Sequence, residues 1–225
     1  MSEERDRPIV ITPDMLAGAG RDGRIDFERG MRTAPRLILV LIAANAAMFA
    51  WELATGALAG PDNIIDAGAL VRERVLHGEW LRLVSATFLH AGWDHLVGNC
   101  LVLYIMGMAC EHAFGFARTA AVYFASGLTG SLLSVALSPG PSVGASGAIF
   151  GVVGAVIAVM YRHQQRFYVR DKRIGFVLAA WAVYQITTGF VSPYIDNSAH
   201  IGGLLGGGAA GLGLTPRLLS ERPTG

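Results

Sequence analysis

The chain carries little charge and almost no lysine. Only 16% of its 225 residues are charged, and Lys172 is the one lysine, whereas an ordinary soluble domain is about a quarter charged. Hydrophobic residues make up 52% of the sequence, and the mean hydropathy is positive. This balance predicts a polytopic membrane protein with a single membrane domain. The formal net charge of +1 gives no electrostatic reason to expect nucleic acid as a partner.

The sequence also lacks the short motifs of several enzyme classes. It contains no Walker phosphate-binding loop, no HExxH zinc motif and no CxxC pair. Cys100 and Cys110 fall in one expected helix, about 15 Å apart, which is too far for a disulfide bond between them. A metal site is disfavoured, because His90 and His95 lack the HExxH glutamate and obvious carboxylate partners. We therefore expect no metal and no cofactor.

Long uncharged stretches predict the membrane-spanning helices. A helix needs about 20 mostly apolar residues to cross a bilayer, and the uncharged run from Thr119 to Tyr161 is too long for one span. The segment SPGPS, from Ser138 to Ser142, divides this run because proline and glycine end helices. The sequence thus predicts an all-α protein, a bundle of six transmembrane helices over residues 37–58, 95–113, 118–138, 143–161, 174–193 and 198–214.

Arginine is distributed unevenly around these spans. Seven arginines precede the first span, and four more accompany Lys172 in the loop YRHQQRFYVRDKR between the fourth and fifth. The loops after the third and fifth spans contain neither lysine nor arginine. By the positive-inside rule, both chain ends lie in the cytoplasm (N-in/C-in). Residues 1–36, which lack the early apolar core of a signal peptide, and residues 215–225 are then cytoplasmic tails around a membrane domain over 37–214.

This orientation brings polar residues from three helices to one depth. The second, fourth and sixth spans all enter from the extracytoplasmic side, and near their starts lie His95 and Asn99, Ser146, and His200. Each has an ordinary explanation alone: Ser146 is a small packing residue in VGASGAIFGVVGAV, and His200 is an interfacial histidine. Polar groups inside a bilayer are costly, however, and several at one depth indicate a functional site.

A serine and a histidine together predict a nucleophile and its base, since serine is weakly nucleophilic until a base removes its proton. Asn99 and His95, one helical turn apart, could donate hydrogen bonds to an oxyanion, as could the Ser146 backbone N–H. Phe150 lies one turn below Ser146, where its ring could support the imidazole or simply pack in the core. Close helix approach is predicted by the small-residue pairs Gly147/Gly151, Gly202/Gly206 and Gly203/Gly207.

Other catalytic arrangements fit less well. A Ser–Lys dyad is excluded because Lys172 is expected on the cytoplasmic side, opposite the serine. An aspartyl protease would need paired aspartates within the spans, whereas Asp196 stands alone at a helix edge. Capping a helix N-terminus is the role that we expect for Asp196.

The same residues resemble the rhomboid intramembrane serine proteases. GASGAIFG, from Gly144, is similar to the family's GxSG motif, and AHIGGLLGG, from Ala199, is similar to its AHxxG motif. HAGWDHLVGN matches HxxxxHxxxN, and GMACEHAFG resembles GxxxExxxG around Glu111. EWLR resembles the family's Trp-Arg element, although Leu81 separates the two residues. The motifs keep the family's order over about residues 37–214.

The resemblance implies an intramembrane serine protease with Ser146 as nucleophile and His200 as general base, a dyad without a required acid. It also implies that His95 and Asn99, with the Ser146 backbone, form the oxyanion hole. Many members have tyrosine where this chain has Phe150. Supporting positions implied by the motifs are His90, Phe150, Gly144 and Arg82.

The implied partners are transmembrane protein substrates and the lipid bilayer, and the oligomeric state stays open. Composition fits a prokaryotic inner or plasma membrane, with the site toward the extracytoplasmic face. Trp181 and Phe190 are candidate gate residues of the fifth helix, although no motif fixes them. Two other classes of protein remain. One is an escort, a rhomboid-like pseudoprotease that binds transmembrane proteins without cleaving them, and it predicts loss of the serine or histidine. The other is a small transporter, which predicts inverted repeats or paired intramembrane charges.

Overall fold

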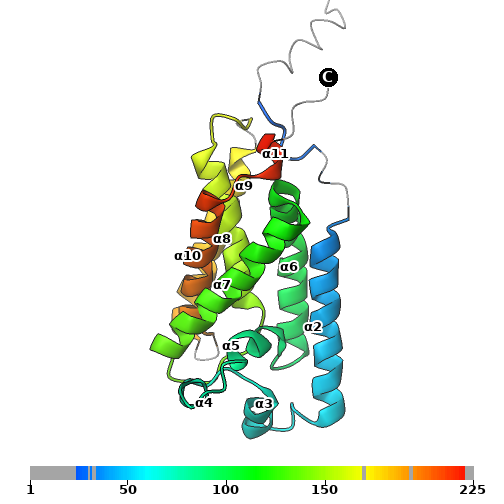
Figure 1. Ribbon diagram of the computed structural model, residues 1–225, viewed down its shortest axis with the longest axis vertical. Helices are drawn as coiled ribbons and strands as arrows, with labels where there is room; N and C mark the ends of the chain where they lie inside the picture. The colour runs from blue at the N-terminus through cyan, green and yellow to red at the C-terminus, as the bar shows by residue number, and fades with distance from the viewer. Residues whose placement is uncertain (1–23, 30, 32–33, 169–170, 193–194, 221–225) are drawn as a thin grey trace, which may run out of the picture.

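The computed structural model describes residues 24–29, 31, 34–168, 171–192 and 195–220 (Figure 1). Within them the fold is helical, with two isolated bridges and no longer strand. The predicted cytoplasmic tails lie partly outside the described residues, at 1–23, 30, 32–33 and 221–225. The six longest helices are α2 (Arg36–Thr55), α6 (Trp93–Phe114), α7 (Phe116–Leu137), α8 (Ser146–Arg162), α9 (Lys172–Val191) and α10 (Asn197–Gly213).

These helices coincide with the six ranges predicted from the sequence, and their ends differ by a few residues. The first stops at Thr55 because Gly56 adopts a left-handed conformation with φ of 73°. The fourth begins at Ser146 because Gly144 has φ of 120°, which a helix does not allow. By length and composition, α2, α6, α7 and α9 could each cross a membrane, whereas α8 and α10 have 17 residues each.

Consecutive long helices run in alternating directions (Figure 1). One end of the bundle is covered by residues 56–92, and we call it the capped end. Its short helices are α3 (Pro61–Ala67), α4 (Arg72–Leu76), α5 (Arg82–Ser85) and the 3₁₀ helix η1 (Ala86–Phe88). The described chain ends, including α11 (Arg217–Ser220), lie at the opposite end. Both α8 and α10 therefore begin at the capped end.

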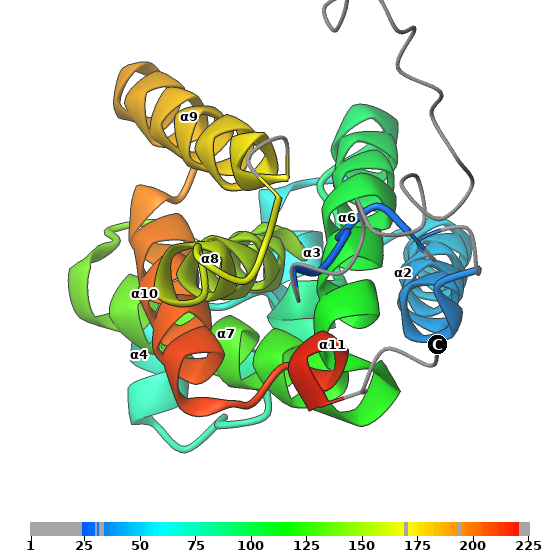
Figure 2. The same cartoon turned by 90° about the horizontal axis from the view of Figure 1, so that it is seen from above.

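Helix α8 occupies the middle of the bundle and α9 its edge (Figure 2). The small residues of α8 allow this central position, because a helix surrounded by others must let several backbones approach. An added Cβ at Gly203 or Gly207 of α10 would lie 1.9 Å from the carbonyl oxygen of Gly147 or Gly151, respectively. Only glycine fits there, so the close approach predicted from the glycine spacing is confirmed.

The second glycine pair of α10 packs against a different helix. A Cβ at Gly202 would lie 2.7 Å from the carbonyl oxygen of Thr129 in α7, and one at Gly206 would meet the Thr129 side chain. The Thr129 hydroxyl in turn donates to the Gly202 carbonyl at 3.0 Å. Thus α10 uses one glycine face for α8 and the other for α7, which fixes its rotation about its own axis.

At the end opposite the capped end, carboxylate side chains accept hydrogen bonds from backbone N–H groups. Glu111 of α6 accepts from Leu37 and Ile38 at 3.2 Å each, so it caps the first turn of α2. Glu111 thus joins the last turn of α6 to the first turn of α2. Asp171, directly before α9, accepts from the Phe27 N–H at 2.9 Å, and the Phe27 side chain is fully buried. This part of region 1–36 therefore packs against the bundle.

Candidate active site

Ser146 is the first residue of α8, and its position exposes backbone donors. The first helical hydrogen bond runs from the Ile149 N–H to the Ala145 carbonyl at 3.0 Å. The N–H groups of Ser146 and Gly147 precede it, so helix geometry leaves them without helical partners. The positive end of the helix dipole lies at the same place. A negative charge developing beside Ser146 would therefore meet donors that are already oriented.

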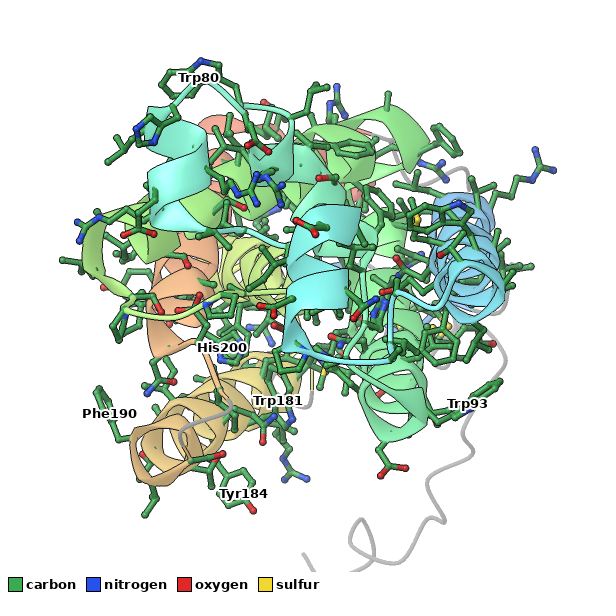
Figure 3. The ribbon with its side chains drawn as sticks, turned by 90° about the horizontal axis from the view of Figure 1, so that it is seen from below. Trp80, Trp93, Trp181, Tyr184, Phe190 and His200 are labelled. Carbon is green, nitrogen blue, oxygen red and sulfur yellow. The ribbon has the colours of Figure 1, made fainter. Side chains whose placement is uncertain are left out.

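His200 lies in the first turn of α10, directly across from Ser146. Its Nε2 atom is 2.9 Å from the Ser146 Oγ atom, and its side chain is buried (Figure 3). The other ring nitrogen, Nδ1, has no hydrogen-bond partner among the described residues. A neutral imidazole with its proton on Nδ1 can accept the serine proton at Nε2.

Asp196 fixes the start of α10. Its Oδ1 atom accepts from the Ala199 N–H at 3.1 Å, which confirms the predicted capping role. Its Oδ2 atom accepts from the Ser134 hydroxyl of α7. The cap thus places the first turn of α10, which carries His200, against a neighbouring helix.

Two aromatic rings lie beside the imidazole. Phe150 stacks on His200 with ring centroids 4.2 Å apart and an interplanar angle of 14°. Trp181 of α9 packs on Phe150 at 5.1 Å, and Figure 3 shows it on the inner side of α9. The possible support of the imidazole by Phe150 is therefore observed as a stacking contact. Tyr184 and Phe190 point away from the bundle, so Phe190 does not contact the site in this arrangement (Figure 3).

His95 and Asn99 of α6 lie against Gly144, two residues before Ser146. A Cβ at Gly144 would lie 2.7 Å from His95 Nε2 and 3.5 Å from Asn99 Nδ2. His95 Nδ1 is 3.4 Å from the Ala91 N–H, which donates to it. The neutral ring then carries its proton on Nε2, the atom beside Gly144. Asn99 donates one amide hydrogen to the His95 carbonyl at 3.0 Å and keeps the second available.

His90 and Glu52 link this site to α2. His90 is fully buried, and its ring lies edge-on to His95 at 5.3 Å. Its backbone N–H donates to the two carboxylate oxygens of Glu52 at 3.1 and 3.2 Å. Sequence reasoning missed Glu52, although a lone acid within an expected span is a signal in itself.

Arg82 organises the loop that covers the site. Its side chain donates to the Ala69 carbonyl at 2.8 Å and to the Ile65 carbonyl, and Nε is 2.6 Å from a Glu79 oxygen. The hydrogen bond from Arg82 lowers the pKa of the Glu79 carboxyl below its usual value. The intervening Leu81 is 84% exposed, so its presence leaves Arg82 free to point inward.

A small cavity lies next to Ser146. Its volume is ≈ 20 Å³, which is room for about one water molecule. Thr87, Ser131, Gly144 and Ser146 are among the residues that line it. Within the described residues, no group of three or more histidine, cysteine or acidic side chains is arranged to hold a metal ion.

Comparisons with known proteins agree with this arrangement of motifs. The family model of the Rhomboid domain matches residues 77–217. Rhomboid protease GluP of Bacillus subtilis (strain 168) is 38% identical over 190 residues, which are 84% of this chain and 36% of that protein. RHOMBOID-like protein 5 of Arabidopsis thaliana is 43% identical over 143 residues, 62% of this chain and 46% of that protein. This chain therefore spans less than half the length of either relative.

A third relative is closer in size. The putative rhomboid protease YdcA of Bacillus subtilis (strain 168) is 35% identical over 136 residues, which are 59% of this chain and 66% of that protein. The matched family region includes Ser146, His200, His95 and Asn99, and it begins within the capped end.

Proposed function

Because the chain belongs to the rhomboid family, we propose that it is an intramembrane serine protease that cleaves peptide bonds in or near transmembrane helices. Ser146 is the nucleophile and His200 the general base. The observation that carries this proposal is the 2.9 Å distance between Ser146 Oγ and His200 Nε2. That distance is within hydrogen-bond reach, which a base needs in order to remove the serine proton.

The chain is an integral membrane protein, as its apolar helices and its relatives indicate. We extend this to six spans, with residues 37–214 as the membrane domain and both tails in the cytoplasm. The capped end then faces the extracytoplasmic side of a prokaryotic inner or plasma membrane. Support comes from the arginine-rich loop after α8, which lies at the end opposite the capped end.

The proposed reaction proceeds through an acyl-enzyme. Ser146 attacks the substrate carbonyl while His200 takes its proton at Nε2 and then returns it to the leaving amine. The oxyanion accepts hydrogen bonds from the Ser146 N–H, from His95 Nε2 and from the second amide hydrogen of Asn99. Water then hydrolyses the ester, with His200 again as base. The cavity beside Ser146, which has room for a water molecule, supports this last step.

The substrate must expose a peptide carbonyl, whereas a membrane helix holds its carbonyls in hydrogen bonds. The proposed substrates are therefore transmembrane proteins whose helices unwind at low cost near the extracytoplasmic surface. Glycine, proline and other poor helix formers at that depth would provide such a site.

Purified protein in lipid vesicles, mixed with a transmembrane substrate that carries a glycine-rich outer segment, tests the assignment. Ser146→Ala and His200→Ala should each lower the cleavage rate at least about 10³-fold. Ser126→Ala is the matched control, because Ser126 is equally a small hydroxyl in the bundle and its buried Oγ has no partner among the described residues. Near-normal cleavage by the Ser146 or His200 variant refutes the dyad, and binding of substrate without cleavage by the unmodified protein indicates an escort instead.

A further inference from the structure

Glu52 is a buried acid in the last turn of an apolar helix. It lies in α2, one of the helices long and apolar enough to cross a membrane, and its exposed fraction is 0%. A carboxyl group in such a place is costly unless a donor satisfies it. The donor here is the backbone N–H of His90, which lies 3.1 and 3.2 Å from the two oxygens.

That N–H belongs to a segment without helical hydrogen bonds of its own. Between η1 and α6 the chain is extended at Leu89, with φ of −80° and ψ of 150°, and it enters α6 through Gly92. A buried N–H in such a segment would be left unpaired without an external acceptor, which is unfavourable because its hydrogen bond to water is lost and not replaced. Glu52 supplies that acceptor from a helix 38 residues earlier in the chain.

The next residue along the segment contacts the site. The Ala91 N–H donates to His95 Nδ1 at 3.4 Å, and the His90 ring lies edge-on to the His95 ring. Holding the His90 N–H therefore also fixes the direction of the adjacent Ala91 N–H. That donor decides which ring nitrogen of His95 carries the proton, since Nδ1 must be the acceptor.

We propose that Glu52 is a positioning residue for the reaction: it anchors residues 90–91 so that His95 presents its Nε2–H beside Gly144. The inference rests on the proposed function, in which His95 stabilises the oxyanion. Glu52 does not touch the reacting atoms and acts through His90 and Ala91. The structure requires only an oxygen acceptor at this position, so a carbonyl of glutamine can replace a carboxylate oxygen.

Two substitutions separate this role from plain helix packing. Glu52→Gln keeps an acceptor, whereas Glu52→Leu removes it at similar side-chain volume. Asn45→Leu is the matched control, because Asn45 lies two turns earlier on the same face of α2 and is equally 0% exposed. Like Glu52→Leu, it replaces a buried polar group of α2 by an apolar one, but at a distance from the segment 90–91.

Cleavage kinetics and hydrogen exchange are measured on the full chain in lipid vesicles. Glu52→Leu should lower kcat at least about tenfold with KM within about twofold, because only transition-state contacts are affected. Glu52→Gln should stay within about threefold of the unmodified protein, and Asn45→Leu should leave kcat near its normal value. When His95→Ala is already present, adding Glu52→Leu should lower kcat only a little further, because the two changes disrupt one interaction. Full additivity there overturns the route through His95.

Hydrogen exchange is measured on the Ser146→Ala protein and followed in the peptide that covers residues 88–95, so this result does not depend on activity. Glu52→Leu should speed exchange of the His90 amide about tenfold, whereas the glutamine and Asn45→Leu variants should not. Unchanged exchange with Glu52→Leu, or equal kcat for Glu52→Leu and Asn45→Leu, overturns the proposal. If the unmodified protein shows no Ser146-dependent cleavage, the proposed function fails, and positioning for catalysis fails with it. The exchange result then decides separately whether Glu52 anchors the segment.

Discussion

Helices α10 and α9 both pack beside α8, and they do so in opposite ways. The α8–α10 interface brings backbones into contact, since a Cβ at Gly203 or Gly207 would lie 1.9 Å from a carbonyl oxygen of α8. Helix α9 instead stands at the edge and leaves large side chains uncovered, with Phe176 and Phe190 each 76% exposed. The two proposed dyad residues lie on the first interface. Helix α9 approaches them through Trp181, which packs on Phe150, and through the Ile186 carbonyl, which accepts from the Asn197 side chain of α10.

The difference follows from what drives packing in a membrane. Lipid tails are as apolar as leucine, so helices associate through close van der Waals contact more than through burial. Small residues allow this close backbone contact between α8 and α10, whereas bulky side chains keep the backbone of α9 farther from α8. The distance between Ser146 and His200 is thus set by backbone contacts, whereas the position of α9 depends on a few side chains.

The largest effect is expected at the glycine interface. Gly207→Val would place a Cβ against the Gly151 carbonyl oxygen, which is backbone and cannot move aside. We expect a loss of stability of about 3 kcal/mol and cleavage reduced at least about 100-fold, measured by thermal unfolding in micelles and by substrate cleavage in vesicles. Gly208→Ala is the control, because its Cβ would be 3.9 Å from the Gly154 oxygen, an ordinary contact. If both variants behave alike, close packing does not set the dyad distance.

A smaller effect is expected at the cap of α10. Asp196→Ala removes the acceptor for the Ala199 N–H and the partner of Ser134. The loss of such a cap costs about 1 kcal/mol, and the first turn that carries His200 should loosen, so kcat should fall several-fold. Asp196→Asn keeps a capping oxygen and should recover most of the loss. Equal stability of the alanine variant and the unmodified protein would contradict the role of the cap.

A lesser effect is expected where α9 touches the site. Trp181→Ala removes the ring that packs on Phe150, which itself stacks on His200. Lipid can replace the apolar surroundings of the lost ring, so the expected cost is that of the aromatic pair itself, about 0.5–1.5 kcal/mol. The kcat should fall by a few-fold. Both are measured with the same unfolding and cleavage assays. A kcat loss as large as that of Gly207→Val would show that α9 positions the dyad as strongly as α10 does.

The smallest effect is expected on the exposed face of α9. Phe190→Ala removes a ring that points away from the bundle (Figure 3) and contacts no part of the site. Stability should change by no more than about 0.5 kcal/mol, and cleavage should stay within about twofold. A large fall in kcat without a fall in stability would instead assign the exposed face of α9 a part in handling substrate.

Much of the fold followed from local pattern. The six helix ranges came from apolar length, the break before α8 from SPGPS, and the α8–α10 contact from glycine spacing, because each property is written in neighbouring residues. The cap by Asp196 was predictable for the same reason. Glu52 was not, since its partner is a backbone N–H 38 residues away and no side-chain motif records it. The hydrogen bond from the Phe27 N–H to Asp171 was not predicted either, because its donor is also a backbone N–H, 144 residues away in the chain.

The sequence by itself determined that the chain is a helical membrane protein, which residues its motifs share with the rhomboid family, and which helices can approach closely. Only the tertiary structure decided which glycine face of α10 meets α8, where the ring nitrogens of His95 and His200 point, and that α2 holds the segment before His95. The reason is physical: composition and spacing fix what one helix can do. A hydrogen bond between distant segments exists only once packing has brought its donor and acceptor together.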